Sequence, residues 1–292
     1  MNHNFRGTGV ALVTPFNADG TIDFNGLTKL VELQISGGTD FLVVQGTTGE
    51  SPVLSQEEKM QVLQHVIEIN QKQLPVVYGL GGNNTKEVCE KIKHLPNGVD
   101  GLLSVSPYYN KPLQAGIIAH YKEIARCTQL PIILYNVPGR TSSNVSAATT
   151  LALAQIPNIV AMKEASGDFD QIMEILKNKP KDFTVLSGDD AITMPLISMG
   201  VEGVISVVAN ALPERFSSMV HRSLNKEMYH AKKEHFELFD MIRLLFAEGN
   251  PGGIKEALVY RKICENHMRL PLVPVSEGLK AKLFAEMKTL LS

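Results

Sequence analysis

Eight short runs rich in valine, isoleucine and leucine recur along the 292-residue chain, and their spacing constrains the fold more than any other feature. The runs are continuous rather than alternating, which is typical of strands covered on both faces. Successive runs begin 20 to 34 residues apart, which leaves room for one helix between each pair. The sequence therefore predicts right-handed βαβ units and a parallel sheet. The runs begin near Val10, Phe41, Pro75, Gly101, Pro131, Ile159, Phe183 and Gly203.

Eight such units fit either an open doubly wound sheet or a closed barrel. Regular spacing without a switch point favours the barrel, and so does the chain length. The residues after the eighth run contain no further strand-like run, and they predict helices interrupted near residues 249–253 and 270–274. We therefore expect an α/β fold, a (β/α)8 TIM barrel over residues 1–225 with a C-terminal helical appendage over residues 226–292.

The clearest helix signal lies over residues 55–71. Ser55 and Glu58 form an S-x-x-E pattern, which caps a helix N-terminus. Met60, Leu63 and Ile67 then recur at helical intervals, which predicts a single apolar face.

Composition excludes several classes of function. Lys and Arg number 28 against 30 Asp and Glu, so no basic excess is available to bind nucleic acid. The longest apolar stretch, residues 194–212, contains Glu202 and Asn210 and is unsuited to spanning a membrane. Three widely spaced cysteines indicate a reducing compartment, and residues 1–7 lack the apolar segment of a secretory signal. We expect a cytoplasmic protein with neither a nucleic-acid nor a membrane partner.

Active sites of such barrels lie at the carboxyl ends of the strands, where Lys163 follows the sixth run. Alternation places Lys163 on the same strand face as Ile159 and Ala161. If that face lines the barrel, the low-dielectric interior favours a neutral amine that can attack a carbonyl. The alternative is a strand-end lysine that reaches solvent or pairs with Glu164.

Other strand ends supply side chains that suit carbonyl chemistry. Tyr135 ends the fifth run, close enough for its phenol to transfer protons to an adduct on Lys163, with Thr47 and Tyr109 as candidate relays. The turn at residues 46–51 carries hydroxyl groups and backbone N–H groups that suit a carboxylate, and Arg140 suits a second one. Taken singly, these features also fit satisfied tyrosines, an ordinary β-to-α turn and a surface arginine.

Several cofactor and metal signatures are missing from the sequence. The glycines at residues 79–82 lack the third glycine of a dinucleotide fingerprint, and no G-x-x-x-x-G-K-[ST] motif or metal-binding histidine cluster occurs. Asp189 and Asp190 follow the seventh run, where phosphate-binding barrels hold their anion, and they would repel a phosphate. An unphosphorylated carboxylate substrate fits better.

Four motifs at these strand ends resemble the dihydrodipicolinate synthase family, in the right order and spacing from about Gly7 to about Leu258. The resemblance adds a specific expectation to the barrel and carbonyl chemistry inferred above. The motifs are Gly46-Thr47-Thr48-Gly49-Glu50-Ser51, Tyr108-Tyr109-Asn110-Lys111-Pro112, Tyr135-Asn136-Val137-Pro138-Gly139-Arg140-Thr141 and Lys163-Glu164-Ala165.

The resemblance implies that a lysine condenses with pyruvate to a Schiff base, whose enamine attacks L-aspartate-4-semialdehyde on the diaminopimelate route to lysine. The implied reaction requires no cofactor or metal, because the Schiff base is the electron sink. The resemblance also implies a homotetramer, a dimer of dimers in which a second tyrosine reaches the site from a neighbouring subunit. The implied roles are Lys163 as nucleophile, Tyr135 as proton donor and acceptor linked through Thr47 to Tyr109, Thr47 and Thr48 for the pyruvate carboxylate, Arg140 for the semialdehyde carboxylate, and the carbonyls of Gly188 and Ile205 beside the lysine.

Related branches use other aldehydes, and N-acetylneuraminate lyase is the alternative function. That branch typically has Ser-Thr in place of Thr47-Thr48 and lacks the Pro-Gly-Arg that ends at Arg140, so these residues favour the semialdehyde branch. A catalytically dead relative retained as a binding module would have lost Lys163, Tyr135 or the threonine pair, and all are present.

Two departures from the family pattern remain. Lysine-inhibited relatives usually carry two histidines where this chain has Gln56 and Lys59, and Lys59 would repel an incoming lysine ammonium. We therefore expect weak or absent feedback inhibition, although other residues match the regulatory cleft. The second departure, at residues 250–255, is assigned to a helix-linking turn away from the chemistry. The matching regulatory residues are Ser51, Asn83, Glu87 and Tyr108.

Overall fold

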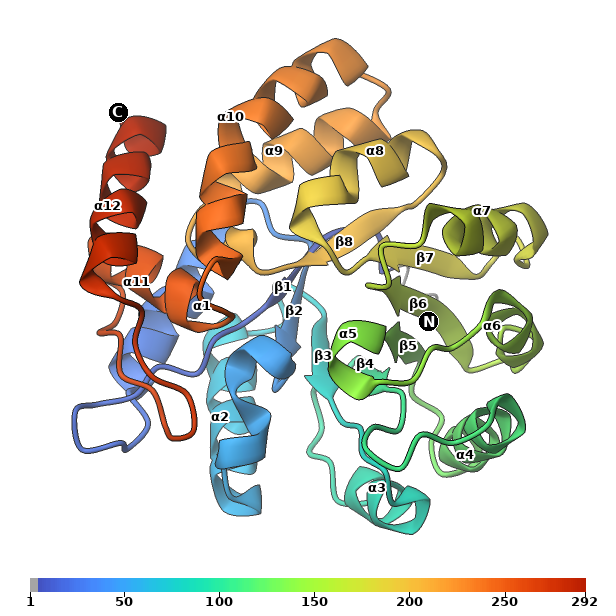
Figure 1. The fold of residues 1–292 in the computed structure, drawn as a ribbon. Helices are drawn as coiled ribbons and strands as arrows, with labels where there is room; N and C mark the ends of the chain where they lie inside the picture. The colour runs from blue at the N-terminus through green and yellow to red at the C-terminus, as the bar shows by residue number, and fades with distance from the viewer. Residues whose placement is uncertain (1–4) are drawn as a thin grey trace.

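Eight parallel strands close into one barrel in the computed structural model, which describes residues 5–292. Each strand pairs with the next along the chain, and the eighth pairs with the first, so the (β/α)8 barrel expected from the sequence is confirmed (Figure 1). The strands are β1 (Gly7–Ala11), β2 (Phe41–Val44), β3 (Val76–Gly79), β4 (Gly101–Val105), β5 (Ile132–Asn136), β6 (Ile159–Glu164), β7 (Thr184–Ser187) and β8 (Gly203–Ser206).

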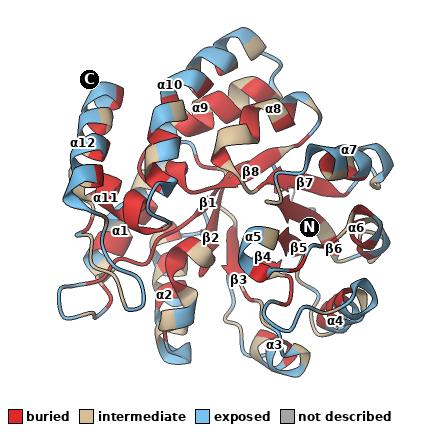
Figure 2. Cartoon of the chain, viewed as in Figure 1, coloured by how far each residue is buried: buried red, intermediate tan, exposed pale blue. Residues whose placement is uncertain are grey.

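The strands divide two apolar cores between their faces. One face packs inside the barrel, where Tyr135 and Ile205 lie, and the other packs against the surrounding helices. Figure 2 shows the strands almost wholly buried, with exposure confined mainly to the outer helix faces and loops. Burial of both strand faces explains why the runs are continuously apolar.

β6 departs from simple alternation at its start. Ile159 pairs with Ile132 and Ala161 pairs with Ile133, so Val160 is an extra residue at a bulge. Ile159 therefore packs in the outer core, whereas Ala161 packs inside the barrel. The expectation that Ile159 shares the face of Lys163 was wrong, because alternation does not account for a bulge.

Helices surround the barrel, and short 3-10 turns follow some strands. In α2, Ser55 and Glu58 form the expected capping box, with the Glu58 N–H donating to Ser55 Oγ at 3.2 Å. The surrounding helices are α1 (Phe24–Ser36), α2 (Gln56–Asn70), α3 (Thr85–Ile92), α4 (Gln114–Arg126), α6 (Ala147–Leu153), α7 (Phe169–Asn178), α8 (Thr193–Ser198) and α9 (Pro213–Leu224). The short helix α5 (Pro138–Thr141) follows β5 and lies over the opening of the barrel (Figure 1). The 3-10 turns are η1 (Thr47–Gly49), η2 (Ser51–Val53), η3 (Asp190–Ile192) and η4 (Val208–Asn210).

Three further helices follow the barrel: α10 (Met228–Phe246), α11 (Gly252–Tyr260) and α12 (Glu277–Leu291). They contact one another at one side of the barrel, with α10 also packed along α9 (Figure 1). The domain boundary after residue 225 stays a prediction. Within residues 5–292, no helix combines the length and apolar character needed to cross a bilayer. The expectation about a leader rests largely on residues 1–4, which lie outside the described residues.

Candidate active site

Lys163 and Tyr135 lie side by side inside the barrel. They pair directly across β6 and β5, and Nζ of Lys163 is 4.4 Å from the centroid of the Tyr135 ring. Both side chains are only 6% exposed. Lys163 neither reaches solvent nor pairs with Glu164, and no carboxylate within the described part of the chain forms an ion pair with it. The barrel interior therefore holds an unpaired amine beside a phenol.

Gly188 leaves room for that lysine. Its N–H donates to the Glu164 carbonyl at 2.7 Å, which brings the chain after β7 against the end of β6. A Cβ at this position would lie 2.6 Å from Cβ of Ala165 and 3.1 Å from Cε of Lys163. Ile205 is 1% exposed in the same interior core, on β8. Gly188 therefore lies against the Lys163 side chain, and Ile205 packs in the same interior core.

The turn after β2 carries Thr47 and Thr48 on η1. Thr48 is buried, and Nδ2 of Asn250 donates to its Oγ1 at 3.0 Å. Because Oγ1 accepts this bond, the hydroxyl hydrogen of Thr48 remains able to donate to an anion. The carbonyl of Gly49 accepts from Thr14 Oγ1 at 2.7 Å, which attaches the turn to the end of β1.

Sequence reasoning missed the contact made by Asn250. Residues 250–255 were assigned to a helix-linking turn away from the chemistry; the turn does link α10 to α11, but its two ends also contact the segment after β2. Asn250 contacts Thr48, and Nζ of Lys255 donates to Oε1 of Glu50 at 2.5 Å. No local signal could have predicted these contacts, because each joins residues about 200 positions apart in the chain.

The loop that carries Arg140 is attached to the barrel by a buried polar network. Nδ2 of Asn136 donates to both Glu164 carboxylate oxygens at 3.1 Å, and Oδ1 of Asn136 accepts from the Val145 N–H at 2.9 Å. The Ser166 N–H also donates to Glu164, at 2.6 Å. Burial raises the pKa of Glu164, and these hydrogen bonds oppose the shift. Arg140 itself is exposed on α5, free to meet a charged group from solvent.

Tyr109 does not join the other site residues within one chain. Its side chain is 87% exposed and its φ of 72° is unusual for a tyrosine. A loop held in this conformation presents the phenol outward. The structure therefore leaves Tyr109 apart from Lys163 and Tyr135 within one chain.

Of the four residues matched to a regulatory cleft, Asn83 and Tyr108 are in direct contact. Nδ2 of Asn83 donates to the Tyr108 carbonyl at 3.2 Å, and Glu87 forms an ion pair with Lys91 on α3. Burial lowers the pKa of Lys59, the Lys91 cation lowers it further, and Glu87 opposes the shift. The charge of Lys59 is therefore influenced by Glu87, one of these four residues. Ser51 is half-buried at the start of η2.

Asp190 does not face the barrel mouth as the phosphate argument assumed. It is buried, and its Oδ2 accepts from the Val207 and Val208 N–H groups at 2.9 and 3.0 Å. Burial raises the pKa of Asp190 to about 6, against the effect of these hydrogen bonds. Its carboxyl group shapes the turn after β8 rather than repelling an anion, so that exclusion rests on Asp189 alone.

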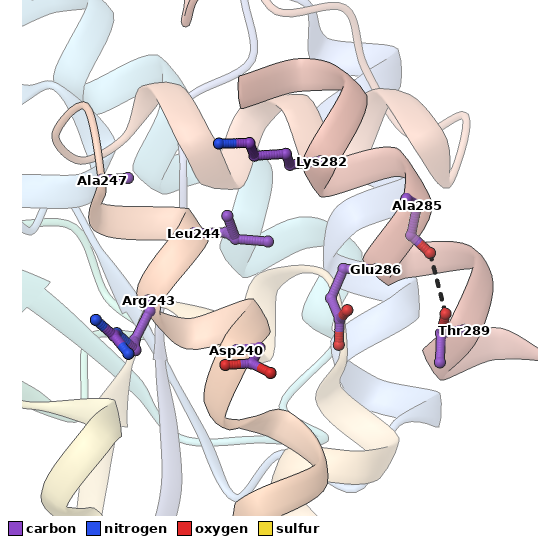
Figure 3. A pocket seen from close by; sticks show the side chains of 8 residues that line it. All are labelled: Asp240, Arg243, Leu244, Ala247, Lys282, Ala285, Glu286 and Thr289. Atoms are coloured by element: carbon purple, nitrogen blue, oxygen red, sulfur yellow. Dashed lines mark hydrogen bonds between the residues drawn. The ribbon is translucent and has the colours of Figure 1, made fainter. Parts of the chain in front are cut away.

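A groove of about 570 Å³ lies away from the strand ends, between α10 and α12 (Figure 3). Its charges are of both signs and none of its residues comes from a strand end, so it is a poor candidate for the chemistry. Among residues 5–292, no group of three or more His, Cys, Asp or Glu side chains is placed to hold a metal ion. The groove is lined by Asp240, Arg243, Leu244, Ala247, Lys282, Ala285, Glu286 and Thr289.

Comparison with known proteins bears on this site. A model of the dihydrodipicolinate synthetase family matches residues 4–290. The 4-hydroxy-tetrahydrodipicolinate synthase of Parabacteroides distasonis is 50% identical over 273 residues, covering 93% of this chain and 92% of that protein.

Solved structures give the same result. Dihydrodipicolinate synthase from Aquifex aeolicus superposes with a TM-score of 0.95 at 39% identity and covers 98% of each chain. The chloride-inhibited dihydrodipicolinate synthase from Acinetobacter baumannii, solved in complex with pyruvate, superposes with a TM-score of 0.95 at 40% identity and also covers 98% of each chain.

Proposed function

The chain belongs to the dihydrodipicolinate synthetase family, and on that premise we propose that Lys163 is the nucleophile that binds pyruvate as a Schiff base. The activity is that of a 4-hydroxy-tetrahydrodipicolinate synthase, a lyase of lysine biosynthesis that uses pyruvate. The observation that carries the assignment to Lys163 is its burial beside Tyr135 without a carboxylate partner among the described residues.

The proposed chemistry begins with the neutral amine of Lys163. The amine attacks the ketone carbon of pyruvate, and water leaves to give an iminium. Loss of a methyl proton then gives the enamine, whose carbon attacks the aldehyde of L-aspartate-4-semialdehyde. The amino group of that second substrate displaces the lysine and closes the ring. Tyr135 supplies and removes protons in these steps, since its ring lies 4.4 Å from Nζ.

Thr47 and Thr48 are proposed to hold the pyruvate carboxylate. Support comes from Thr48, whose Oγ1 accepts from Asn250 and so keeps its own hydrogen available to the substrate. Arg140 is proposed to hold the semialdehyde carboxylate, because an exposed guanidinium on an anchored loop can form two parallel hydrogen bonds to it. The carbonyls of Gly188 and Ile205 are proposed to lie around the Lys163 side chain.

Tyr109 is proposed to act from a neighbouring subunit in a homotetramer built as a dimer of dimers. Support comes from its exposure and from Leu113 on the same loop, which is 83% exposed. Complementation tests this directly: Tyr109→Ala and Lys163→Ala chains, each inactive alone, should regain activity when mixed and reassembled. Failure to regain activity, with mixed dimers demonstrated, would contradict action from the partner. A cytoplasmic location is part of the same proposal, supported by the biosynthetic family.

The cluster around Ser51, Asn83, Glu87 and Tyr108 is proposed to respond weakly to lysine, because Lys59 adds a cation near it. Submillimolar lysine should leave the initial rate unchanged, and Lys59→Ala should increase the sensitivity. Strong inhibition of the unmodified enzyme at submillimolar lysine would refute this expectation.

Borohydride reduction tests the central assignment. Pyruvate and borohydride together should inactivate the enzyme, and peptide mass spectrometry should place the reduced adduct on Lys163. Lys163→Ala should form no adduct and show no turnover with pyruvate and the semialdehyde, while Lys177→Ala, which alters an exposed lysine on α7, should behave as the unmodified enzyme. An adduct at another lysine would overturn the proposal.

A further inference from the structure

The C-terminal region contacts the turn after β2 at three points. The segment of residues 47–53, termed here the cradle loop, carries Thr47 and Thr48 at its start. Asn250 donates to the Thr48 hydroxyl at 3.0 Å, Lys255 donates to the Glu50 carboxylate at 2.5 Å, and a guanidinium nitrogen of Arg269 donates to the Val53 carbonyl at 2.9 Å. A region expected to be an appendage therefore forms part of the wall behind the proposed pyruvate site.

The contact between Lys255 and Glu50 is the most buried of the three. Neither side chain has any exposed surface, and Nζ of Lys255 also donates to the His267 carbonyl at 2.9 Å. The same Nζ lies 4.3 Å from the centroid of the Phe16 ring. Burial lowers the pKa of Lys255, and the Glu50 carboxylate opposes that shift. Because separating the two charges would leave each one buried and unpaired, at a high cost in free energy, the Lys255 and Glu50 side chains stay in contact.

The backbone conformation of Glu50 links the position of its side chain to the shape of the cradle loop. Its φ of 54° and ψ of 32° are left-handed, a conformation that glutamate rarely adopts. The Glu50 N–H closes the η1 turn by donating to the Thr47 carbonyl at 3.2 Å. A side chain anchored to α11 therefore stabilises the backbone conformation that ends the turn, and the orientation of Thr47 and Thr48 depends on that turn.

We propose that Lys255, acting through Glu50, is a positioning residue for the carboxylate of pyruvate. It does not contact the substrate; it sets the place of the cradle loop and hence of the donors on Thr47 and Thr48. The inference rests on the proposed role of those threonines. Because a displacement of about 1 Å in a bound substrate can cost about 100-fold in rate, loss of this anchor should mainly weaken pyruvate binding.

The decisive variant is Lys255→Met combined with Glu50→Met. Replacing both partners removes the anchor without leaving a buried charge unpaired, so the barrel should stay folded. We expect the KM for pyruvate to rise about 10-fold or more, with kcat at saturating pyruvate and the KM for the semialdehyde each changing less than about 3-fold. Borohydride trapping without the second substrate should show the same rise in half-saturating pyruvate. A folded double variant with an unchanged pyruvate KM would overturn the proposal.

Three further variants serve as controls for this test. Lys280→Met removes an ion pair to Glu256 between α12 and α11 that does not touch the cradle loop, and it should leave the pyruvate KM unchanged. An equal rise in this control would show a general effect of loosening the region and would count against Lys255. If the double variant fails to fold, Glu50→Gln keeps an acceptor for Lys255 and should raise the pyruvate KM about 3-fold; no rise would overturn the proposal.

The third control variant distinguishes a failure of this inference from a failure of the proposed threonine role on which it rests. Thr48→Val removes the proposed donor directly and should raise the pyruvate KM by itself. If Thr48→Val has no effect, the role of the threonine is wrong and the inference falls with it. If Thr48→Val raises the KM and the double variant does not, only the role of Lys255 is wrong.

Discussion

Replacing Gly188 by alanine should disable the enzyme while leaving its fold in place. The added Cβ would lie 2.6 Å from Cβ of Ala165, 3.2 Å from the Glu164 carbonyl oxygen and 3.1 Å from Cε of Lys163. The first two atoms belong to or are fixed by backbone, whereas Cε is near the end of a flexible side chain. The clash should therefore be relieved partly by moving Lys163 away from its present position.

The size of the effect follows from these distances. Carbon atoms in ordinary contact are about 3.5–4.0 Å apart, so the local structure must move by about 1 Å. Overpacking of this kind typically costs about 1–3 kcal/mol, which lowers the thermal midpoint of a chain this long by several degrees without unfolding it. A 1 Å displacement of a reacting group can cost about 100-fold in rate. We expect kcat/KM for pyruvate to fall by about that factor.

The assay combines steady-state rates with borohydride trapping, which reports whether Lys163 still forms its adduct. Gly278→Ala is the matched control, since its Cβ would meet nothing closer than Ser276 Oγ at 3.9 Å. This control should keep unmodified kinetics and gain slight stability from lower chain entropy. A folded Gly188→Ala enzyme with unmodified turnover and trapping would refute the steric reasoning and the place assigned to Lys163.

Two further predictions concern charge. Arg140→Ala should raise the KM for the semialdehyde about 10- to 100-fold, as expected for a lost charge-assisted contact of about 1.5–3 kcal/mol. The pyruvate concentration that gives half-maximal borohydride trapping should stay unchanged. A rise in the KM for pyruvate alone would contradict the assigned role. His221 on α9 lies 2.7 Å from Asp40, which raises the pKa of His221. A histidine whose pKa is raised on folding stabilises the folded state fully at pH values below its ordinary pKa of about 6.5. This contribution is lost as the pH rises through the pKa of the folded state. His221→Gln should therefore lower the thermal midpoint more at pH 5.5 than at pH 8.5, and an equal loss at both would show that the ion pair contributes nothing.

How far the sequence predicts this fold depends on the range of the interaction involved. The strands and the capping box at Ser55 and Glu58 were predictable, because alternation, apolar runs and caps act over a few residues. The approach of Lys163 to Tyr135 was predictable, because a parallel barrel brings the carboxyl ends of neighbouring strands together. The bulge that turns Ile159 outward was not, since it depends on which residues of β5 and β6 pair.

The contacts behind the cradle loop show the same limit more sharply. Lys255 and Glu50 are 205 positions apart, and a lysine and a glutamate seen singly predict exposed surface residues. Only the folded chain shows that each is the other's buried partner. A buried pair of this kind adds little net stability compared with apolar residues of similar volume, so its presence calls for another explanation. Specifying one position for the loop that carries Thr47 and Thr48 is such an explanation. It requires that the apolar double variant remain stable and yet bind pyruvate poorly, a combination that a purely structural role for the pair does not produce.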